Sequence, residues 1–167
     1  CQRLRTLRRR IVHHQDALVQ ALRDDLGKPD AEARMTELLP VYEEIAGAIR
    51  HLPSWAKARR VAPTLAMLGT RSRLRPEPRG RSLILAPWNY PFSLAMGPVV
   101  SALAAGCPVT LKPSEFAPAT SAVMARIVRE AFRPDEVTVV EGGVEVATAL
   151  LALPFDHVFF TGSTAVG

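Results

Sequence analysis

Three short motifs in the second half of the sequence carry side chains that could do chemistry. The first is LAPWNYPF (85–92), which contains Asn89, the only asparagine among 167 residues. An asparagine carboxamide donates two hydrogen bonds without ionising, so it could stabilise a developing oxyanion. Asn89 also stands shortly before Pro91, where it could cap the following helix. Its position alone favours the cap, and both interpretations stay open at this point.

The second motif is KPSE, which places Lys112 and Glu115 directly after an apolar run. Lysine is rare in this chain, where arginine supplies most of the positive charge, so a compact ammonium at this point is informative. An ammonium with a carboxylate at a strand end suits a ribose, because the carboxylate accepts hydrogen bonds from hydroxyls. The alternative is a local ion pair that caps the next helix.

The third motif is FTGSTAVG (160–167), in which Gly162 and Gly167 flank Ser163 and Thr164. Such a loop can present backbone N–H groups and hydroxyls to a phosphate, above all when it follows a strand. A plain turn is the alternative interpretation.

The elements around these motifs alternate between strands and helices. We predict strands at 83–86, 108–111, 137–140 and 157–160, with helices over 92–105, 118–132 and 144–152. Strands that are apolar throughout and separated by helices indicate a doubly wound parallel α/β sheet, covered on both faces. Ligands of such sheets bind at the carboxyl ends of the strands, where all three motifs lie. This shared placement favours the oxyanion role for Asn89 over the cap.

The first half of the chain is predicted to be mainly helical. Apolar residues at helical spacing predict one helix over 3–26, and a second from Asp30 to Leu52 that Pro40 kinks or splits. A short helix follows over 53–60. The alternating residues 70–76 and the apolar run 82–87 then predict two strands joined by a turn.

Composition and charge narrow the function classes. The chain is long enough for one domain, and its 48% apolar residues are typical of a globular protein. Residues 1–81 carry 17 basic against 9 acidic residues, but the N-terminal arginines alternate with leucines at helical spacing and indicate a solvated helix face. We therefore expect no nucleic-acid partner. Residues 87–111 lack charge, yet their prolines and glycines argue against a membrane span.

The two cysteines form no disulfide framework or metal-ligand pattern, which favours a cytoplasmic setting and predicts no metal site. The chain begins on Cys1 and stops inside a motif at Gly167, so we expect a fragment of a longer protein.

Taken together, LAPWNYPF, AAGCPVTLKPSE and FTGSTAVG resemble the NAD(P)-dependent aldehyde dehydrogenase superfamily over essentially the whole chain. The run from KPSE to FTGSTAVG is most similar to the coniferyl-aldehyde dehydrogenase branch, close to the class 3 enzymes. The resemblance implies N-terminal helices followed by an incomplete Rossmann-like cofactor domain. It divides the chain into a helical segment (1–69), a bridging or oligomerisation strand (70–81) and an NAD(P)-binding domain (82–167).

The resemblance also assigns roles to individual residues. Asn89 would form part of an oxyanion hole, and Pro87 and Trp88 would border the nicotinamide ribose. It implies that Lys112 and Glu115 contact the adenosine ribose. Gly162, Ser163 and Gly167 would belong to the pyrophosphate loop. Gly143 and Val166 would lie on the adenine side. Because Glu115 would repel a 2′-phosphate, NAD is favoured, and NADP remains possible.

The activity that the resemblance implies is oxidation of an aldehyde, in this branch an aromatic one, to the carboxylic acid. That reaction proceeds through a thiohemiacetal and a thioester on a cysteine, and a glutamate activates the hydrolytic water. Neither motif is found in this sequence. Cys107 stands where the family commonly has asparagine and is predicted to be a core residue, while Cys1 has no motif around it. We therefore expect these 167 residues to be inactive by themselves.

Two alternatives remain at this stage. The chain could belong to an acylating dehydrogenase or an acyl-phosphate reductase, which need no hydrolytic water, or it could be a non-catalytic nucleotide-binding module. For the complete protein the resemblance implies a homodimer built with the 70–81 strand. An unpaired strand edge in this piece would favour aggregation.

Overall fold

The computed structural model describes residues 1–163, and its centre is a four-stranded sheet in which every neighbouring pair is parallel. The strand order is β5-β4-β3-β6, with bounds Ser82–Leu85 (β3), Val109–Lys112 (β4), Val137–Val139 (β5) and His157–Phe160 (β6). All four strands lie within one residue of their predicted positions. The predicted doubly wound parallel sheet is thus confirmed.

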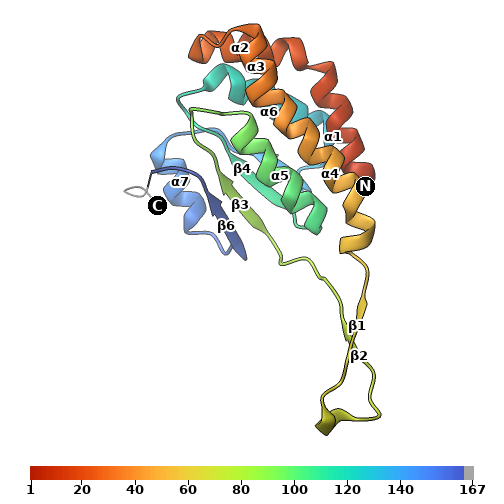
Figure 1. Cartoon of the computed structure of the whole chain (residues 1–167). Coiled ribbons are helices and arrows are strands. Elements are labelled where there is room, and N and C mark those ends of the chain that lie inside the picture. The colour runs from red at the N-terminus through yellow and green to blue at the C-terminus, as the bar shows by residue number, and fades with distance from the viewer. Residues whose placement is uncertain (164–167) are drawn as a thin grey trace.

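Helices cover both faces of this sheet (Figure 1). The helices that follow β3, β4 and β5 are α5 (Ser93–Ala105), α6 (Pro118–Ala131) and α7 (Val144–Leu151), close to the predicted ranges. Ile84 of β3 shares a buried cluster with α5 and α6, whereas its neighbours Leu83 and Leu85 pack with Leu150 of α7. Because side chains alternate along a strand, α5 and α6 must cover one face and α7 the other.

The N-terminal helices form a further layer over α5 and α6. They are α1 (Gln2–His13), α2 (Gln15–Leu26), α3 (Asp30–Ala33), a π-helical turn η1 (Arg34–Leu38) and α4 (Leu39–Trp55). The predicted single helix over 3–26 was wrong, because the chain bends at His14, whose ring lies 3.0 Å from a Glu130 carboxylate oxygen of α6. Pro40 is the second residue of α4, which directly follows the π-helical turn, in keeping with the predicted split.

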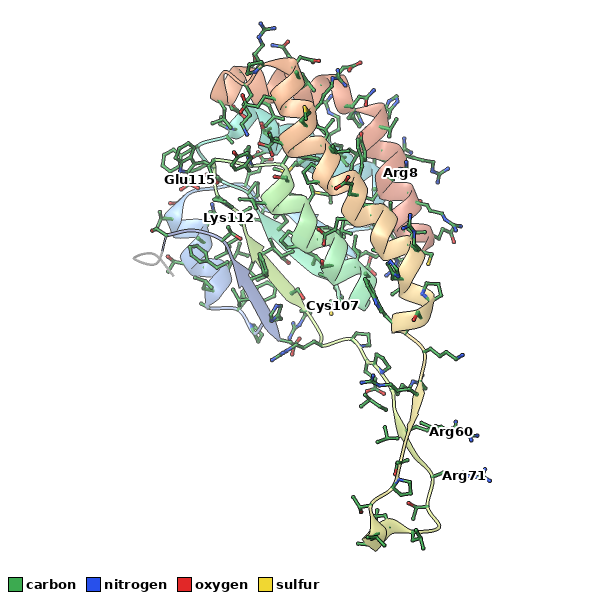
Figure 2. The ribbon with its side chains drawn as sticks, in the orientation of Figure 1. Arg8, Arg60, Arg71, Cys107, Lys112 and Glu115 are labelled. Atoms are coloured by element: carbon green, nitrogen blue, oxygen red, sulfur yellow. The ribbon has the colours of Figure 1, made fainter. Side chains whose placement is uncertain are left out.

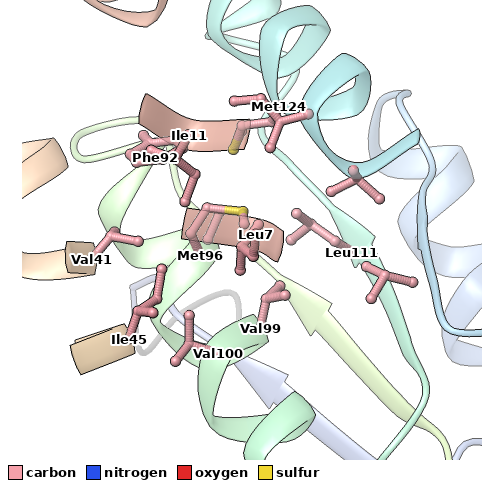
Figure 3. Close-up of a cluster of buried hydrophobic side chains, with 14 of the residues drawn as sticks. Leu7, Ile11, Val41, Ile45, Phe92, Met96, Val99, Val100, Leu111 and Met124 are labelled. Carbon is pink, nitrogen blue, oxygen red and sulfur yellow. The ribbon is translucent and has the colours of Figure 1, made fainter. Parts of the chain in front are cut away.

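These layers share one apolar core. Leu7 and Ile11 of α1, Val41 and Ile45 of α4 and Met96 of α5 point into it, as Figure 3 shows. Each is almost completely buried, and burying a side chain of this size contributes about 1.5–3 kcal/mol. The helical segment is therefore an integral part of the fold that carries the sheet.

A two-stranded arm projects away from this body (Figures 1 and 2). Its strands β1 (Arg59–Val61) and β2 (Ser72–Leu74) are antiparallel, and a 3-10 turn η2 (Leu65–Met67) lies at the tip. The predicted helix over 53–60 was therefore wrong beyond Trp55. The predicted pairing of residues 70–76 with 82–87 was wrong too, because β3 already has β4 and β6 on its two edges. The role of the arm as a bridging segment stays a prediction.

No helix in the described part of the chain is both long and apolar enough to cross a membrane.

Candidate functional site

Hydrogen bonds between the ends of neighbouring strands place the loops after β4, β3 and β6 side by side at the carboxyl edge of the sheet. The Ala86 N–H donates to the Lys112 carbonyl (3.1 Å), and the Thr161 N–H donates to the Leu85 carbonyl (3.2 Å). The loop after β3 therefore lies between the loop after β4 and the loop after β6. Beyond β4, the Val140 N–H donates to the Leu111 carbonyl (2.9 Å). The predicted meeting of the motifs at the carboxyl edge of the sheet is confirmed.

The strand order also contains a reversal. The chain leaves β3 toward β4 on one side, yet it returns from β5 to β6 on the other side of β3. Open parallel sheets bind nucleotides in the crevice that such a reversal of strand order creates. Here the reversal falls between the loop that carries Pro87, Trp88 and Asn89 and the loop that carries Gly162 and Ser163.

Asn89 lies in the exposed turn between β3 and α5 and does not cap that helix. Phe92 occupies the cap position, and the first N–H groups of α5, those of Phe92 and Ser93, donate to Glu37 Oε2 at 3.2 and 2.9 Å. The Asn89 carboxamide oxygen accepts from the Tyr90 N–H (3.1 Å). Within residues 1–163 no hydrogen bond involves Asn89 Nδ2, so its amide protons are available to a ligand. The cap interpretation was wrong.

Acidic side chains from the helical segment occupy two helix N-termini at this edge. Glu37 serves α5, and Asp25 accepts from the Ala119 and Thr120 N–H groups at the start of α6 (3.1 and 2.7 Å). A phosphate would compete with a carboxylate at either position. Among the described α-helices that follow strands, α7 is the one whose N-terminus has no carboxylate from the helical segment. It begins beside its own Glu145 carboxylate instead. The loop after β6 is therefore the better place for an anion at this edge.

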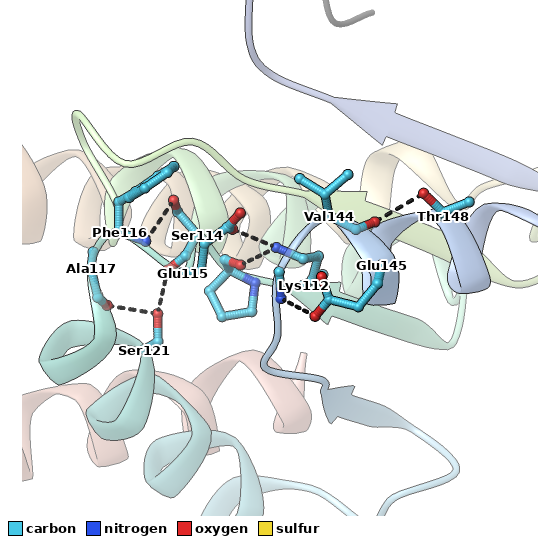
Figure 4. A network of polar contacts seen from close by, with 11 residues as sticks. Lys112, Ser114, Glu115, Phe116, Ala117, Ser121, Val144, Glu145 and Thr148 are labelled. Carbon is cyan, nitrogen blue, oxygen red and sulfur yellow. Dashed lines mark hydrogen bonds and ion pairs between the residues drawn. The ribbon is translucent and has the colours of Figure 1, made fainter.

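Lys112 and Glu115 form an ion pair at the end of β4, with Nζ 2.9 Å from Oε2 (Figure 4). The Lys112 ammonium also donates to the Pro113 carbonyl (3.0 Å) and is buried. A backbone N–H of Glu115 and the ammonium of Lys112 hold the pKa of the Glu115 carboxyl below its ordinary value. The carboxylate is thus ionised at neutral pH, and 32% of its side chain remains exposed.

The alternative interpretation of KPSE is right in part. The local ion pair exists, but the following helix α6 takes its cap from Asp25 rather than from Glu115. The exposed part of the Glu115 carboxylate therefore keeps the capacity to accept hydrogen bonds from a hydroxyl-bearing ligand.

The glycines of the candidate site are held closely by their neighbours. The Gly143 N–H donates to Glu145 Oε1 at 3.1 Å, at the start of α7 (Figure 4). A Cβ at Gly162 would lie 2.3 Å from the Phe160 ring, so a larger residue would displace that ring. Ser163 is exposed. The other two residues named from the sequence, Val166 and Gly167, lie outside the described residues.

Neither cysteine lies at the carboxyl edge. Cys107 is 4% exposed and precedes β4, so it stands at the opposite edge of the sheet from Asn89. The predicted core role of Cys107 is confirmed. Cys1 is exposed and precedes α1. Within residues 1–163, no three His, Cys, Asp or Glu side chains are grouped so as to hold a metal ion.

Two residues that contact the Asn89 turn escaped the sequence analysis. Lys28 and Glu37 lie in the helical segment, yet their side chains contact the turn that carries Asn89. The only signal was a lysine among arginines, at Lys28, and a single acidic residue inside an apolar helical stretch, at Glu37.

Comparison with known proteins places the whole chain in one group. The sequence model of the aldehyde dehydrogenase family matches residues 1–167. Among curated relatives, the chain is 40% identical to 4,4′-diaponeurosporen-aldehyde dehydrogenase of Staphylococcus aureus, and the match covers 99% of this chain and 36% of the relative. It is 37% identical to aldehyde dehydrogenase family 3 member A2 of Macaca fascicularis, over 99% of this chain and 34% of the relative. The chain thus spans about a third of the length of these relatives.

Solved structures give the same answer for the fold. The substrate-bound state of Staphylococcus aureus AldH superimposes with a TM-score of 0.96 at 40% identity, over 99% of this chain and 36% of that one. A Mycobacterium tuberculosis aldehyde dehydrogenase complexed with NAD⁺ superimposes with a TM-score of 0.84 at 25% identity, over 99% and 34%.

Proposed function

The chain belongs to the aldehyde dehydrogenase family, and we propose that it supplies the oxyanion donor and most of the cofactor contacts for NAD(P)-dependent oxidation of an aldehyde to the carboxylic acid. The observation that carries this proposal is the state of Asn89. Its amide protons make no hydrogen bond within residues 1–163, it stands at the carboxyl edge of the parallel sheet, and the capping role that would have occupied it belongs to Glu37.

In the proposed reaction, Asn89 donates to the aldehyde oxygen as the carbonyl carbon becomes tetrahedral and the oxygen gains negative charge. A neutral donor suits this task, because it stabilises the charge when it forms and adds no charge of its own to the site. One such donor is worth about 3–4 kcal/mol of transition-state stabilisation. The hydrogen bond from the Tyr90 N–H to Asn89 Oδ1 fixes which end of the carboxamide is left to donate.

The cofactor supplies the hydride acceptor, and the residues around the crevice are suited to hold it. We propose that Pro87 and Trp88 border the nicotinamide ribose and that Lys112 and Glu115 hold the adenosine ribose. The loop with Gly162, Ser163 and Gly167 would bind the pyrophosphate, and Gly143 and Val166 would lie on the adenine side. The carboxylates that already occupy the N-termini of α5 and α6 support this distribution.

We propose NAD rather than NADP as the preferred cofactor. The Glu115 carboxylate is ionised and partly exposed, so it accepts ribose hydroxyls but repels a 2′-phosphate. The NAD⁺ complex of the Mycobacterium tuberculosis relative supports the same cofactor class.

The nucleophile of the family reaction is assigned to neither cysteine of this chain. The Cys107 thiol is buried at the wrong edge of the sheet, and Cys1 belongs to the outer helical layer. We therefore propose that residues 1–167 alone do not turn over an aldehyde. Within the complete enzyme the substrate is proposed to be an apolar, aromatic aldehyde of the coniferyl type, on the strength of the motif resemblance.

For the complete protein we propose a homodimer to which the β1–β2 arm contributes. Every residue of the two arm strands except the half-buried Ser72 is exposed, and the tip carries apolar side chains such as Leu65 and Leu68. A second copy of the protein would remove these side chains from water.

Calorimetric titration of the chain with NAD tests the proposal. We expect saturable binding that Glu115→Gln weakens, and a smaller preference for NAD over NADP in that variant. The exposed Glu43→Gln is the matched control and should leave both unchanged. An absence of saturable binding by the folded wild-type chain would contradict the proposed function, and NADH formation from an aromatic aldehyde would contradict the proposed inactivity.

A further inference from the structure

A buried ion pair joins the helical segment to the turn that carries Asn89. Lys28 directly follows Gly27, the left-handed residue that ends α2, and Glu37 lies in the π-helical turn η1. Lys28 Nζ is 2.5 Å from Glu37 Oε1. The residues are 8% and 0% exposed. Both charges are therefore removed from water.

The carboxylate of Glu37 holds the start of α5. While Oε1 accepts from Lys28, Oε2 accepts from the Phe92 and Ser93 N–H groups. This one side chain thus binds the chain immediately after the Asn89 turn.

The ammonium of Lys28 holds the turn itself. Besides Glu37, it donates to the main-chain carbonyl of Asn89 (3.1 Å), and it lies 4.1 Å from the centre of the Tyr90 ring. A cation at this distance from an aromatic face is attracted to it. The pair therefore contacts residues 89, 90, 92 and 93, while no hydrogen bond within residues 1–163 joins it to the Asn89 carboxamide.

Stability alone is a poor explanation for this pair. Removing two charges from water costs about as much as their attraction returns, and apolar residues of the same volume often stabilise a fold at least as well. What an ion pair adds is geometry, because its hydrogen bonds accept only one arrangement of the groups around it. The π-helical turn points the same way, since short π-helical insertions in α-helices frequently accompany functional sites.

We propose that Lys28 and Glu37 are positioning residues that fix the direction of the Asn89 carboxamide. They hold the main chain of the turn at the Asn89 carbonyl and at the start of α5, and the Tyr90 N–H then orients Asn89 Oδ1. The catalytic meaning of this arrangement rests on the oxyanion role proposed above for Asn89, whereas the contacts themselves do not.

The composition of the chain offers a direct test. Because Asn89 is the only asparagine, a sample labelled with ¹⁵N-asparagine gives one backbone amide signal and one carboxamide pair in an NMR spectrum. The variants are Lys28→Met, which removes the ammonium, and Glu37→Gln, which keeps the shape of the side chain. The matched control is Asp25→Ala, which removes the equivalent cap of α6 and adds no second asparagine to the chain.

We expect both variants to shift the Asn89 signals and to lower the order parameter of its backbone amide from about 0.85 to below about 0.6. Asp25→Ala should leave these signals in place although it also lowers the melting temperature. Unmoved Asn89 signals in a folded Lys28→Met or Glu37→Gln chain would overturn the proposal, and so would an equal loss of order in the control.

A milder variant covers the case in which those two chains do not fold. Lys28→Arg keeps the charge, but its planar fork pairs with Glu37 in a different direction from an ammonium. We expect it to move the Asn89 carboxamide signals, and unchanged signals would overturn the proposal. A parallel titration with NAD separates the two ideas, because failure to bind NAD contradicts the proposed function and leaves the Asn89 signals to decide the positioning role.

Discussion

The N-termini of α5 and α6 are both capped by a carboxylate, but the two carboxylates are buried to different degrees. Each helix takes a carboxylate from the N-terminal helical segment, but Glu37 is fully buried and paired with Lys28, whereas Asp25 is half-buried and has no ion pair in the described part of the chain. The Asp25 cap shows that a helix start here needs no lysine. We therefore infer that the lysine beside α5 serves the turn that it also contacts, at the main-chain carbonyl of Asn89 and at the Tyr90 ring.

Among the substitutions that test this comparison, Glu37→Ala is expected to lower the free energy of unfolding most. It leaves the Lys28 ammonium buried without its partner and frees two N–H groups of α5, which should cost about 3–5 kcal/mol of unfolding free energy. Urea unfolding followed by circular dichroism measures it. The exposed Glu43→Ala should change the free energy by less than about 0.5 kcal/mol. A loss of the same small size for Glu37→Ala would mean that the pair is not buried as described.

Asp25→Ala should have the next largest effect. It removes a cap that receives two N–H groups but strands no buried charge, so a loss of about 0.5–2 kcal/mol is expected. The same urea experiment applies, with the exposed Asp24→Ala as its neighbour control. If Asp25→Ala cost as much as Glu37→Ala, the difference in depth between the two caps would have no energetic meaning.

A smaller effect is expected from Glu115, whose pKa is lowered in the folded chain by its backbone N–H partner and by Lys112. A carboxyl with a lowered folded pKa contributes stability that is present above its ordinary pKa of 4.5 and is lost as the pH falls through the folded value. The difference in melting temperature between wild type and Glu115→Gln should therefore shrink on acidification from about pH 6 to about pH 3. A difference that stays constant over this range would contradict the ion pair.

The smallest effect should come from Asn89→Ala. A helix cap would cost about 1 kcal/mol on this substitution. Because Glu37 caps α5 instead, we expect a change of less than about 0.5 kcal/mol, measured by urea unfolding. A loss above 1 kcal/mol would restore the capping interpretation and would weaken the case that the carboxamide is reserved for a ligand.

The contrast between Asn89 and its surroundings also shows what a sequence can reveal. The strands and helices after Ser82 carry their own signals in apolar runs and turn residues, so they were predicted to within about a residue, and the row of motifs at the sheet edge followed from topology. The hydrogen bonding of the Asn89 side chain could not be predicted in this way. It depends on Glu37, which lies 55 residues before its partner Phe92, and local spacing contains no trace of such a contact.

Two predictions for the first half of the chain were wrong for related reasons. Nothing in its local sequence marks the bend at His14, which coincides with a contact to Glu130 in α6. Strand β1 is an exposed three-residue segment with two arginines, and only the position of β2 beside it makes it a strand. Both features depend on partners far along the chain, which is where reasoning from propensity loses its basis.

The division of the core has a consequence for how the molecule opens. The larger buried cluster draws on the helical segment, β3, β4, β5, α5 and α6, but on no residue of α7 or β6. The smaller cluster that holds α7 contains only three buried residues. We therefore expect strand β6 and helix α7 to detach together while the rest stays folded, so that their amide protons exchange with solvent first. Strand β6, which leads into the proposed pyrophosphate loop, should then be the part of the sheet least protected from hydrogen exchange.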